Sequence, residues 1–146
     1  METRQKSARD ILKAVAEVKS QAIRLGQRIE LLENKCTNIT ARYGGRAGGV
    51  QDHNELWTIL SDERARLAGQ LRLVMAMERQ ISGWIDLLPR EPWRMVLRLR
   101  YLDGLSFQEV TDAMSQAAGR PYSTAQIYRF HRQALDAADQ LWPLEC

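Results

Sequence analysis

Arginine, glutamine and tyrosine side chains recur at helical spacing between Ser123 and Leu141 of this 146-residue chain. If the segment is a helix, residues three and four positions apart share one exposed face. Arginine can hydrogen-bond to guanine O6 and N7 together, and glutamine can pair with adenine N6 and N7 in the same way. This pattern favours the reading of base pairs in the major groove of double-stranded DNA. The face would consist of Thr124, Ala125, Tyr128, Arg129 and Arg132, with Gln126 and His131 at its flanks.

Two capping patterns frame the elements that must position this face. Ser106 is followed three residues later by Glu109, and Ser123 is followed at the same distance by Gln126. In each pair the serine hydroxyl can accept the backbone N–H of the third residue, whose side chain can reach back to the serine amide. Two capped helices in succession, the second rich in Arg and Tyr, predict a helix-turn-helix. The free N–H groups at Ser123 can also contact phosphate.

Further arginines lie before this helix. Arg94 and Arg98 on a preceding helix, and Arg120 in a loop, are candidates for phosphate contacts, which position a domain without reading sequence. Arg100 is either another such contact or a structural partner for a nearby acid. The alternative interpretation of all these arginines is an ordinary solvated surface. His131 suits packing or capping better than base contact.

Prolines and glycines delimit the C-terminal elements. Pro89 ends one helix, Pro92 suits the first turn of the next, and Gly104 closes that helix as a C-cap. We expect two further helices, over 106–114 and 123–141, joined by a loop over 116–122. Their inward positions are expected to be Phe107, Val110, Met114, Ile127, Phe130, Ala134 and Leu141.

The N-terminal part carries two heptad patterns separated by four glycines between Gly44 and Gly49. Such a pattern is typical of coiled coils, whereas the glycines cannot hold a helix. The first helix would use Ala8, Ile11, Val15, Val18, Ala22, Leu25, Ile29, Leu32, Cys36 and Ile39. The second, from about Asn54 to Leu88, would use Leu60, Leu67, Leu71, Val74, Ile81, Ile85 and Leu88, with Arg64 and Glu78 at polar seam positions.

These elements predict an all-α chain with two domains. Residues 1–88 would form a long antiparallel helical hairpin with a loop at about 43–52, and residues 89–146 a helix-turn-helix domain. Because two helices make a thin core, we expect the hairpin to pair with another copy or to pack on the C-terminal domain. The heptad seam is then the internal core of the hairpin, a homodimer surface, or a platform for RNA polymerase or another phage protein. The candidate oligomerisation residues are Ile11, Val15, Val18, Leu25, Ile29, Leu32, Leu67, Leu71, Val74 and Ile81.

The C-terminal third resembles region 4 of bacterial sigma factors. The resemblance lies in Val96–Tyr101 and Gly104–Val110, and resumes at Ser123, Ile127 and Ala134–Leu135. Two departures stand out: the turn between Met114 and Ser123 is several residues longer than in region 4, and no segment is similar to sigma region 2. The resemblance therefore implies a DNA-binding module and not a complete sigma factor.

The whole chain resembles small phage-encoded proteins, many of unknown function, in which a helical arm precedes a sigma region 4-like domain. The shared stretches are Thr37–Thr40, Leu87–Pro89, Leu99–Tyr101 and Gln126–His131. Some of these proteins are thought to activate late phage genes, and the resemblance implies the same here. Two rival hypotheses are a small terminase-like DNA-packaging subunit, which would assemble into a ring, and an adaptor that binds RNA polymerase.

Composition and motifs argue against several other classes. The net charge of +3 permits nucleic-acid binding without requiring it. Cys36 and Cys146 match no zinc-ligand spacing, and the glycine-rich segment lacks the phosphate-loop pattern. No catalytic set, metal cluster or cofactor motif is evident, so we expect no enzyme. The N-terminus lacks the apolar core of a signal peptide and no window suits a membrane helix, so we expect a cytoplasmic protein of a bacterial host.

Overall fold

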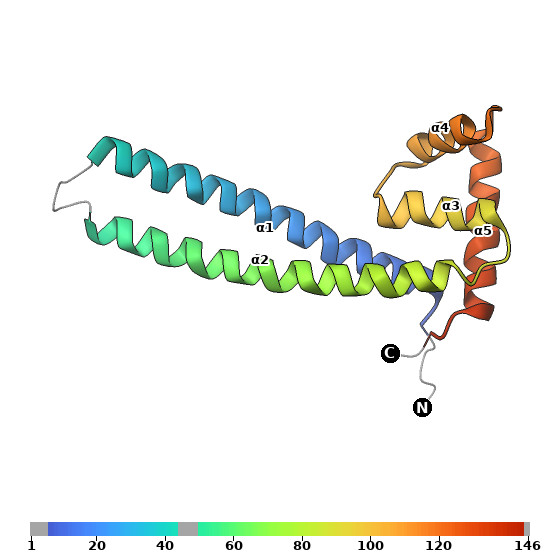
Figure 1. The fold of residues 1–146 in the computed structure, drawn as a ribbon, viewed down its shortest axis with the longest axis horizontal. Helices are drawn as coiled ribbons and strands as arrows, with labels where there is room; N and C mark the ends of the chain where they lie inside the picture. The colour runs from blue at the N-terminus through green and yellow to red at the C-terminus, as the bar shows by residue number, and fades with distance from the viewer. Residues whose placement is uncertain (1–5, 44–49, 145–146) are drawn as a thin grey trace. The chain divides into compact units, whose positions relative to one another are not determined.

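The computed structural model describes residues 6–43 and 50–144, and every regular element within those ranges is a helix (Figure 1). The all-α class expected from the sequence is confirmed. Within these ranges, no helix combines the length and apolarity needed to cross a bilayer. The glycines at 44–49, the side chain of Ile39 and Cys146 lie outside the described residues. The elements are α1 (Ala8–Tyr43), α2 (Val50–Ile85), α3 (Glu91–Leu97), the π-helix η2 (Arg98–Leu102), α4 (Phe107–Ala118) and α5 (Thr124–Leu141).

The chain divides into two compact units, and the division differs from the expected boundary at residue 88. One unit spans Val18–Met75, and the other combines Met1–Glu17 with Ala76–Cys146. The start of α1 and the end of α2 are therefore part of the same unit as α3, η2, α4 and α5. The physical reason is that apolar side chains at these ends continue into the C-terminal core.

In the Val18–Met75 unit, α1 and α2 run antiparallel and share a thin apolar core (Figure 1). An exposed ion pair also joins the two helices: the Arg64 guanidinium donates to the carboxylate of Glu33, with N and O 2.8 Å apart. The expected seam is corrected at Arg64 and Leu71, which lie exposed at the edge of α2. Leu56, outside the expected seam, packs on the core instead. The core comprises Leu25, Ile29, Cys36 and Leu60, with Leu32, Leu56 and Leu67 partly buried against it.

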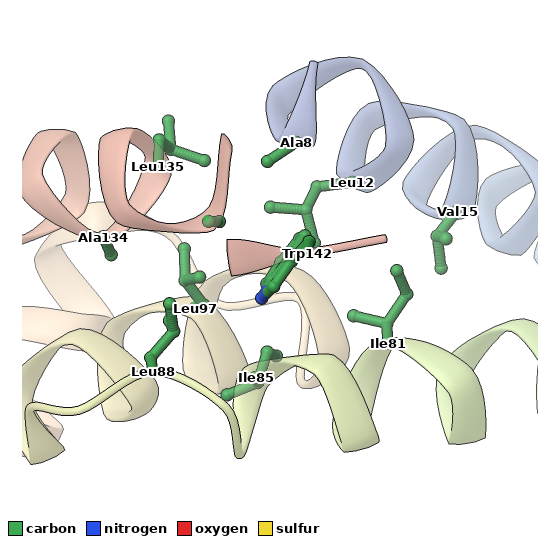
Figure 2. Close-up of a cluster of buried hydrophobic side chains, with 11 residues drawn as sticks. Ala8, Leu12, Val15, Ile81, Ile85, Leu88, Leu97, Ala134, Leu135 and Trp142 are labelled. Atoms are coloured by element: carbon green, nitrogen blue, oxygen red, sulfur yellow. The ribbon is translucent and has the colours of Figure 1, made fainter. Parts of the chain in front are cut away.

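The second unit has its own core, to which α1, α2, α3 and α5 all contribute (Figure 2). Leu12 is fully buried here, whereas Ile11, the expected seam residue, is only partly buried. The first turns of α1 pack against α2, α3 and α5 at once. A wider face of the helix is therefore buried than the heptad seam alone predicts. The buried members are Ala8, Leu12, Val15, Ile81, Ile85, Leu88, Leu97, Ala134, Leu135, Ala138 and Trp142.

The start of α1 is held by side chains from both ends of the chain. Ser7 and Asp10 cap it reciprocally, each side chain accepting the other's backbone N–H at 3.2–3.3 Å. The Asp139 carboxylate on α5 accepts the N–H of Ala8 at 2.7 Å. Since the first N–H groups of a helix have no partner within it, this bond both caps α1 and ties it to α5.

The junction between α4 and α5 is shorter than expected. The sequence predicts a helix ending at Met114 and a loop over 116–122, but α4 continues to Ala118. Alanines propagate a helix well, and Gly119 ends it at φ 68°, a conformation that glycine adopts without strain. The long turn noted as a departure from sigma region 4 is therefore corrected to a connection over residues 119–123.

The end of α5 also departs from expectation. Leu141, expected to face inward, is exposed, and Trp142 is buried in its place. The backbone at Trp142 is extended, so the chain leaves the helix there and the indole turns toward Trp84, with ring centroids 5.8 Å apart.

The helix expected from Pro92 to Gly104 is split into α3 and η2. The N–H of Asp103 donates to the carbonyl of Arg98 at 2.9 Å, five residues back, which widens the last turn into a π-helix. Gly104, at φ 72°, then closes the element, as the sequence predicts.

Both predicted capping boxes are present. The Ser106 hydroxyl accepts the N–H of Glu109 at 3.2 Å, and the Ser123 hydroxyl accepts the N–H of Gln126 at the same distance. Each N3 side chain returns a bond to its serine N–H, at 3.1 and 3.0 Å.

We expect Ser123→Ala to lower the free energy of unfolding by about 0.5–2 kcal/mol, because the N–H of Gln126 loses its acceptor. Urea denaturation followed by circular dichroism measures the change. The matched control is Ser20→Ala, an exposed serine within α1 that should shift stability by less than about 0.5 kcal/mol. Equal effects of the two substitutions would contradict a capping role.

Candidate nucleic-acid interface

The first half of α5 presents one continuous exposed face. Ala125, Tyr128, Arg129 and Arg132 are exposed, and they are related by steps of three and four residues. The opposite face of the helix is buried through Ile127, His131, Ala134, Leu135 and Ala138. The helix is therefore fixed to its unit along one side and open to a partner along the other.

The two arginines of this face are available for binding. Neither guanidinium has a hydrogen-bond or ion-pair partner among the residues that the structure describes. Arg120, in the connection before α5, stacks over the ring of Tyr122 at 5.2 Å and donates to its hydroxyl at 3.2 Å. Its side chain is thereby ordered while the residue remains exposed.

Charge is unevenly distributed along α5. From Thr124 to Gln133 the helix has two arginines and no acid, whereas Asp136 and Asp139 lie in its second half. An anionic partner would therefore be attracted to the N-terminal half, where the helix dipole adds further positive potential.

The start of α5 is held firmly in place. The hydroxyl of Ser115 on α4 accepts the N–H of Tyr122 at 2.9 Å, and the ring of Tyr128 packs on that of Phe107 with centroids 4.4 Å apart. Gln126, expected at the flank of the reading face, uses its side-chain carbonyl in the cap at Ser123. Thr124 is partly buried. The exposed face that could contact DNA therefore consists of Ala125, Tyr128, Arg129 and Arg132, without Thr124 and Gln126.

Two candidate phosphate-binding arginines, Arg94 and Arg98, bind within the protein instead. Arg94 donates to the carbonyl of Leu88 at 2.6 Å. Arg98 donates to the Ser82 hydroxyl at 2.8 Å and forms an ion pair with Asp86. These bonds join the end of α2 to α3 and η2, which is a structural role.

Arg100 also has a structural role, although its partner is not the acid suggested by the sequence. It donates to the carbonyl of Leu105 at 2.9 Å, and its guanidinium lies 4.6 Å from the centroid of the Phe107 ring. It therefore braces the connection between η2 and α4.

His131 lies on the buried side of α5. This position agrees with the expectation that it packs within the protein and does not contact bases. Its Nε2 is 2.8 Å from the Tyr101 hydroxyl, and its ring meets the edge of Phe107 with centroids 5.1 Å apart. Burial, together with the positive charges of Arg9 and Arg100, lowers the pKa of His131 from 6.5 to about 4. Burial also raises the pKa of Tyr101. This pair links η2 to α5 with an uncharged contact.

The pKa of His131 makes folding sensitive to mild acid. Because the folded pKa is below the unfolded value, its contribution to stability is fully present above pH 6.5 and is lost as the pH falls toward 4. We expect His131→Gln, which cannot titrate, to show a shallower loss of unfolding free energy between pH 6.5 and 4. Denaturation at several pH values measures this slope, and a His131 NMR titration midpoint near 6.5 would contradict the expectation.

Several residues that hold α5 in place are not predicted from the sequence. Asp139 binds the start of α1, and Gln133 accepts from the Trp93 indole N–H at 3.1 Å, joining α5 to α3. Arg9, on α1, adds positive charge near His131. Their partners are far away in the sequence, so no local spacing reveals them; only the Ser7–Asp10 cap has a recognisable local signal.

The described residues contain no cluster of histidine, cysteine, aspartate or glutamate side chains arranged to hold a metal ion. What distinguishes this surface is the exposed basic face of a well-anchored helix. No protein-family model, no curated protein and no solved structure matches this chain.

Proposed function

We propose that this protein is a sequence-specific DNA-binding transcriptional regulator in which α4 and α5 form a helix-turn-helix. The observation that carries the proposal is the pair Arg129 and Arg132. Both lie on the exposed first half of α5 without a partner among the described residues, on a helix anchored along its other side. A recognition helix needs this combination, because base contacts demand free donors held in a rigid position.

The proposed contacts divide into two kinds. Arg129 and Arg132 would donate to base edges in the major groove, with Tyr128 and Ala125 packing beside them. Arg120 and the free N–H groups at the start of α5 would hold backbone phosphates, which set the orientation of the helix. Arg94 and Arg98 are left out of this interface because they bond to Leu88, Ser82 and Asp86.

The resemblance to sigma region 4 and to small phage proteins supports the biological setting. It favours an activator of late genes in a phage or prophage, with RNA polymerase as a further partner. The antiparallel α1–α2 pair would then be the helical arm.

Capture of fragments of the encoding genome by the purified chain, at near-physiological salt, tests the proposal. We expect enrichment of one promoter-proximal site. Weak, salt-sensitive retention of all fragments would instead indicate non-specific binding, and would overturn the regulator in favour of an adaptor that binds polymerase. Enrichment within or beside a terminase gene, by a ring-shaped oligomer, would favour the packaging subunit.

A further inference from the structure

The helix α2 carries a second heptad pattern that its packing on α1 leaves exposed. In the Val18–Met75 unit, the residues that face α1 recur every seven positions at Leu60, Leu67 and Val74. A neighbouring set recurs at steps of four and three residues beside them. This outer stripe consists of Trp57, Ser61, Arg64, Ala68, Leu71 and Met75, and all six residues are exposed.

The stripe has the composition of a helix-pairing surface. Leu71 is 45% exposed and Met75 60%, although both lie at spacings that coiled coils bury. Ser61 and Ala68 are small enough to let another helix approach closely. Exposed apolar residues scattered singly are ordinary, but a row at heptad spacing along several turns marks an interaction surface.

The charge of the stripe determines which partner it suits. Its only charged side chain, Arg64, already forms an ion pair with Glu33 of α1. A stripe that is neutralised at its centre and apolar toward Met75 does not attract nucleic acid. It can, however, meet an identical stripe without repulsion between like charges.

We propose that a second copy of this chain docks on the outer stripe, with α2 of each copy packed along α2 of the other. The two α1–α2 pairs would then form a four-helix bundle, the arrangement that gives long antiparallel helices a full core. The residues first expected to pair copies, such as Leu25 and Ile29, are instead buried within each chain.

The stripe supplies part of the surface that a stable pair needs. From Trp57 to Met75 it is roughly 27 Å long at 1.5 Å per residue, so a helix about 10 Å across offers on the order of 270 Å² in projection on each partner, and more over the uneven surface of the side chains. Stable pairs bury about 800 Å² of accessible surface on each partner, so the exposed side chains that flank the stripe would supply the remainder in a four-helix bundle.

The mass of the full chain in solution, measured by light scattering and sedimentation, tests this pairing. One copy weighs 16.8 kDa, and we expect twice that mass. Leu71→Arg should weaken association at least tenfold, because the interface would bury a charge. The matched control is Leu73→Arg on the same helix: Leu73 is 51% exposed but about 200° around the helix from Leu71, and it should leave the pair intact.

Both substitutions are at exposed positions, so each variant should keep the circular dichroism of the parent. A single-copy mass at micromolar concentration, or a mass above two copies, would overturn the pairing. Equal effects of the two variants would overturn the assignment to the outer stripe. The assay contains no DNA, so its outcome is independent of what α5 binds.

Discussion

A chain that carries both Arg129→Ala and Arg132→Ala is expected to lose most of its affinity for the specific DNA site. Each side chain is exposed, lacks a partner among the described residues and lies on a rigidly capped helix. A bidentate contact from arginine to guanine contributes about 1–3 kcal/mol, so the pair should cost at least about 2 kcal/mol. The substitutions remove no bond that the folded protein uses, and stability should be nearly unchanged.

Titration of the captured fragment at several salt concentrations measures this loss. The control is Arg72→Ala with Arg79→Ala, two exposed arginines of α2 whose removal changes the net charge equally. If both double variants lose the same affinity for DNA, the affinity depends on the net charge of the protein and not on contacts made by the exposed face of α5. If the loss is confined to the α5 variant and one base position becomes tolerant, that arginine reads the base.

Truncation of Ile127 to alanine is expected to have the largest effect on folding. Ile127 is fully buried and packs with Val96, Val110 and Met114, which joins α5 to α3 and α4. Removing three carbons from a buried isoleucine costs about 2–5 kcal/mol, since the site loses apolar burial and gains a cavity. This is a large fraction of the stability of a small protein.

Denaturation by urea, monitored by circular dichroism, measures this cost. Ile59→Ala is the matched control, because it makes the same truncation on α2 where the side chain is 42% exposed. Its effect should stay within about 0.5 kcal/mol beyond the change in helix propensity. A small effect at Ile127 would mean that this core does not hold α5 in place. It would then contradict the proposal that the exposed face of α5 is held rigidly for base contacts.

The sequence alone determined the features that depend on neighbours along the chain. The caps at Ser106 and Ser123, the closure at Gly104 and the helical class all follow from spacings of a few residues, and all are present. The exposed face of α5 also followed from periodicity, because a helix with one apolar side must leave the other side open. Proline, glycine and serine act locally, which is why their effects could be read without a structure.

Only the tertiary structure decided which polar groups remain free. Arg94, Arg98 and Arg129 look alike in the sequence. Arg94 bonds to Leu88, just after α2, and Arg98 bonds to Ser82 within α2, whereas Arg129 has no partner among the described residues. It likewise decided that Leu71 lies at an edge while Leu12 is buried. The physical reason is that a heptad pattern fixes which residues share a side of a helix, whereas the rotation of that helix depends on every element that packs against it.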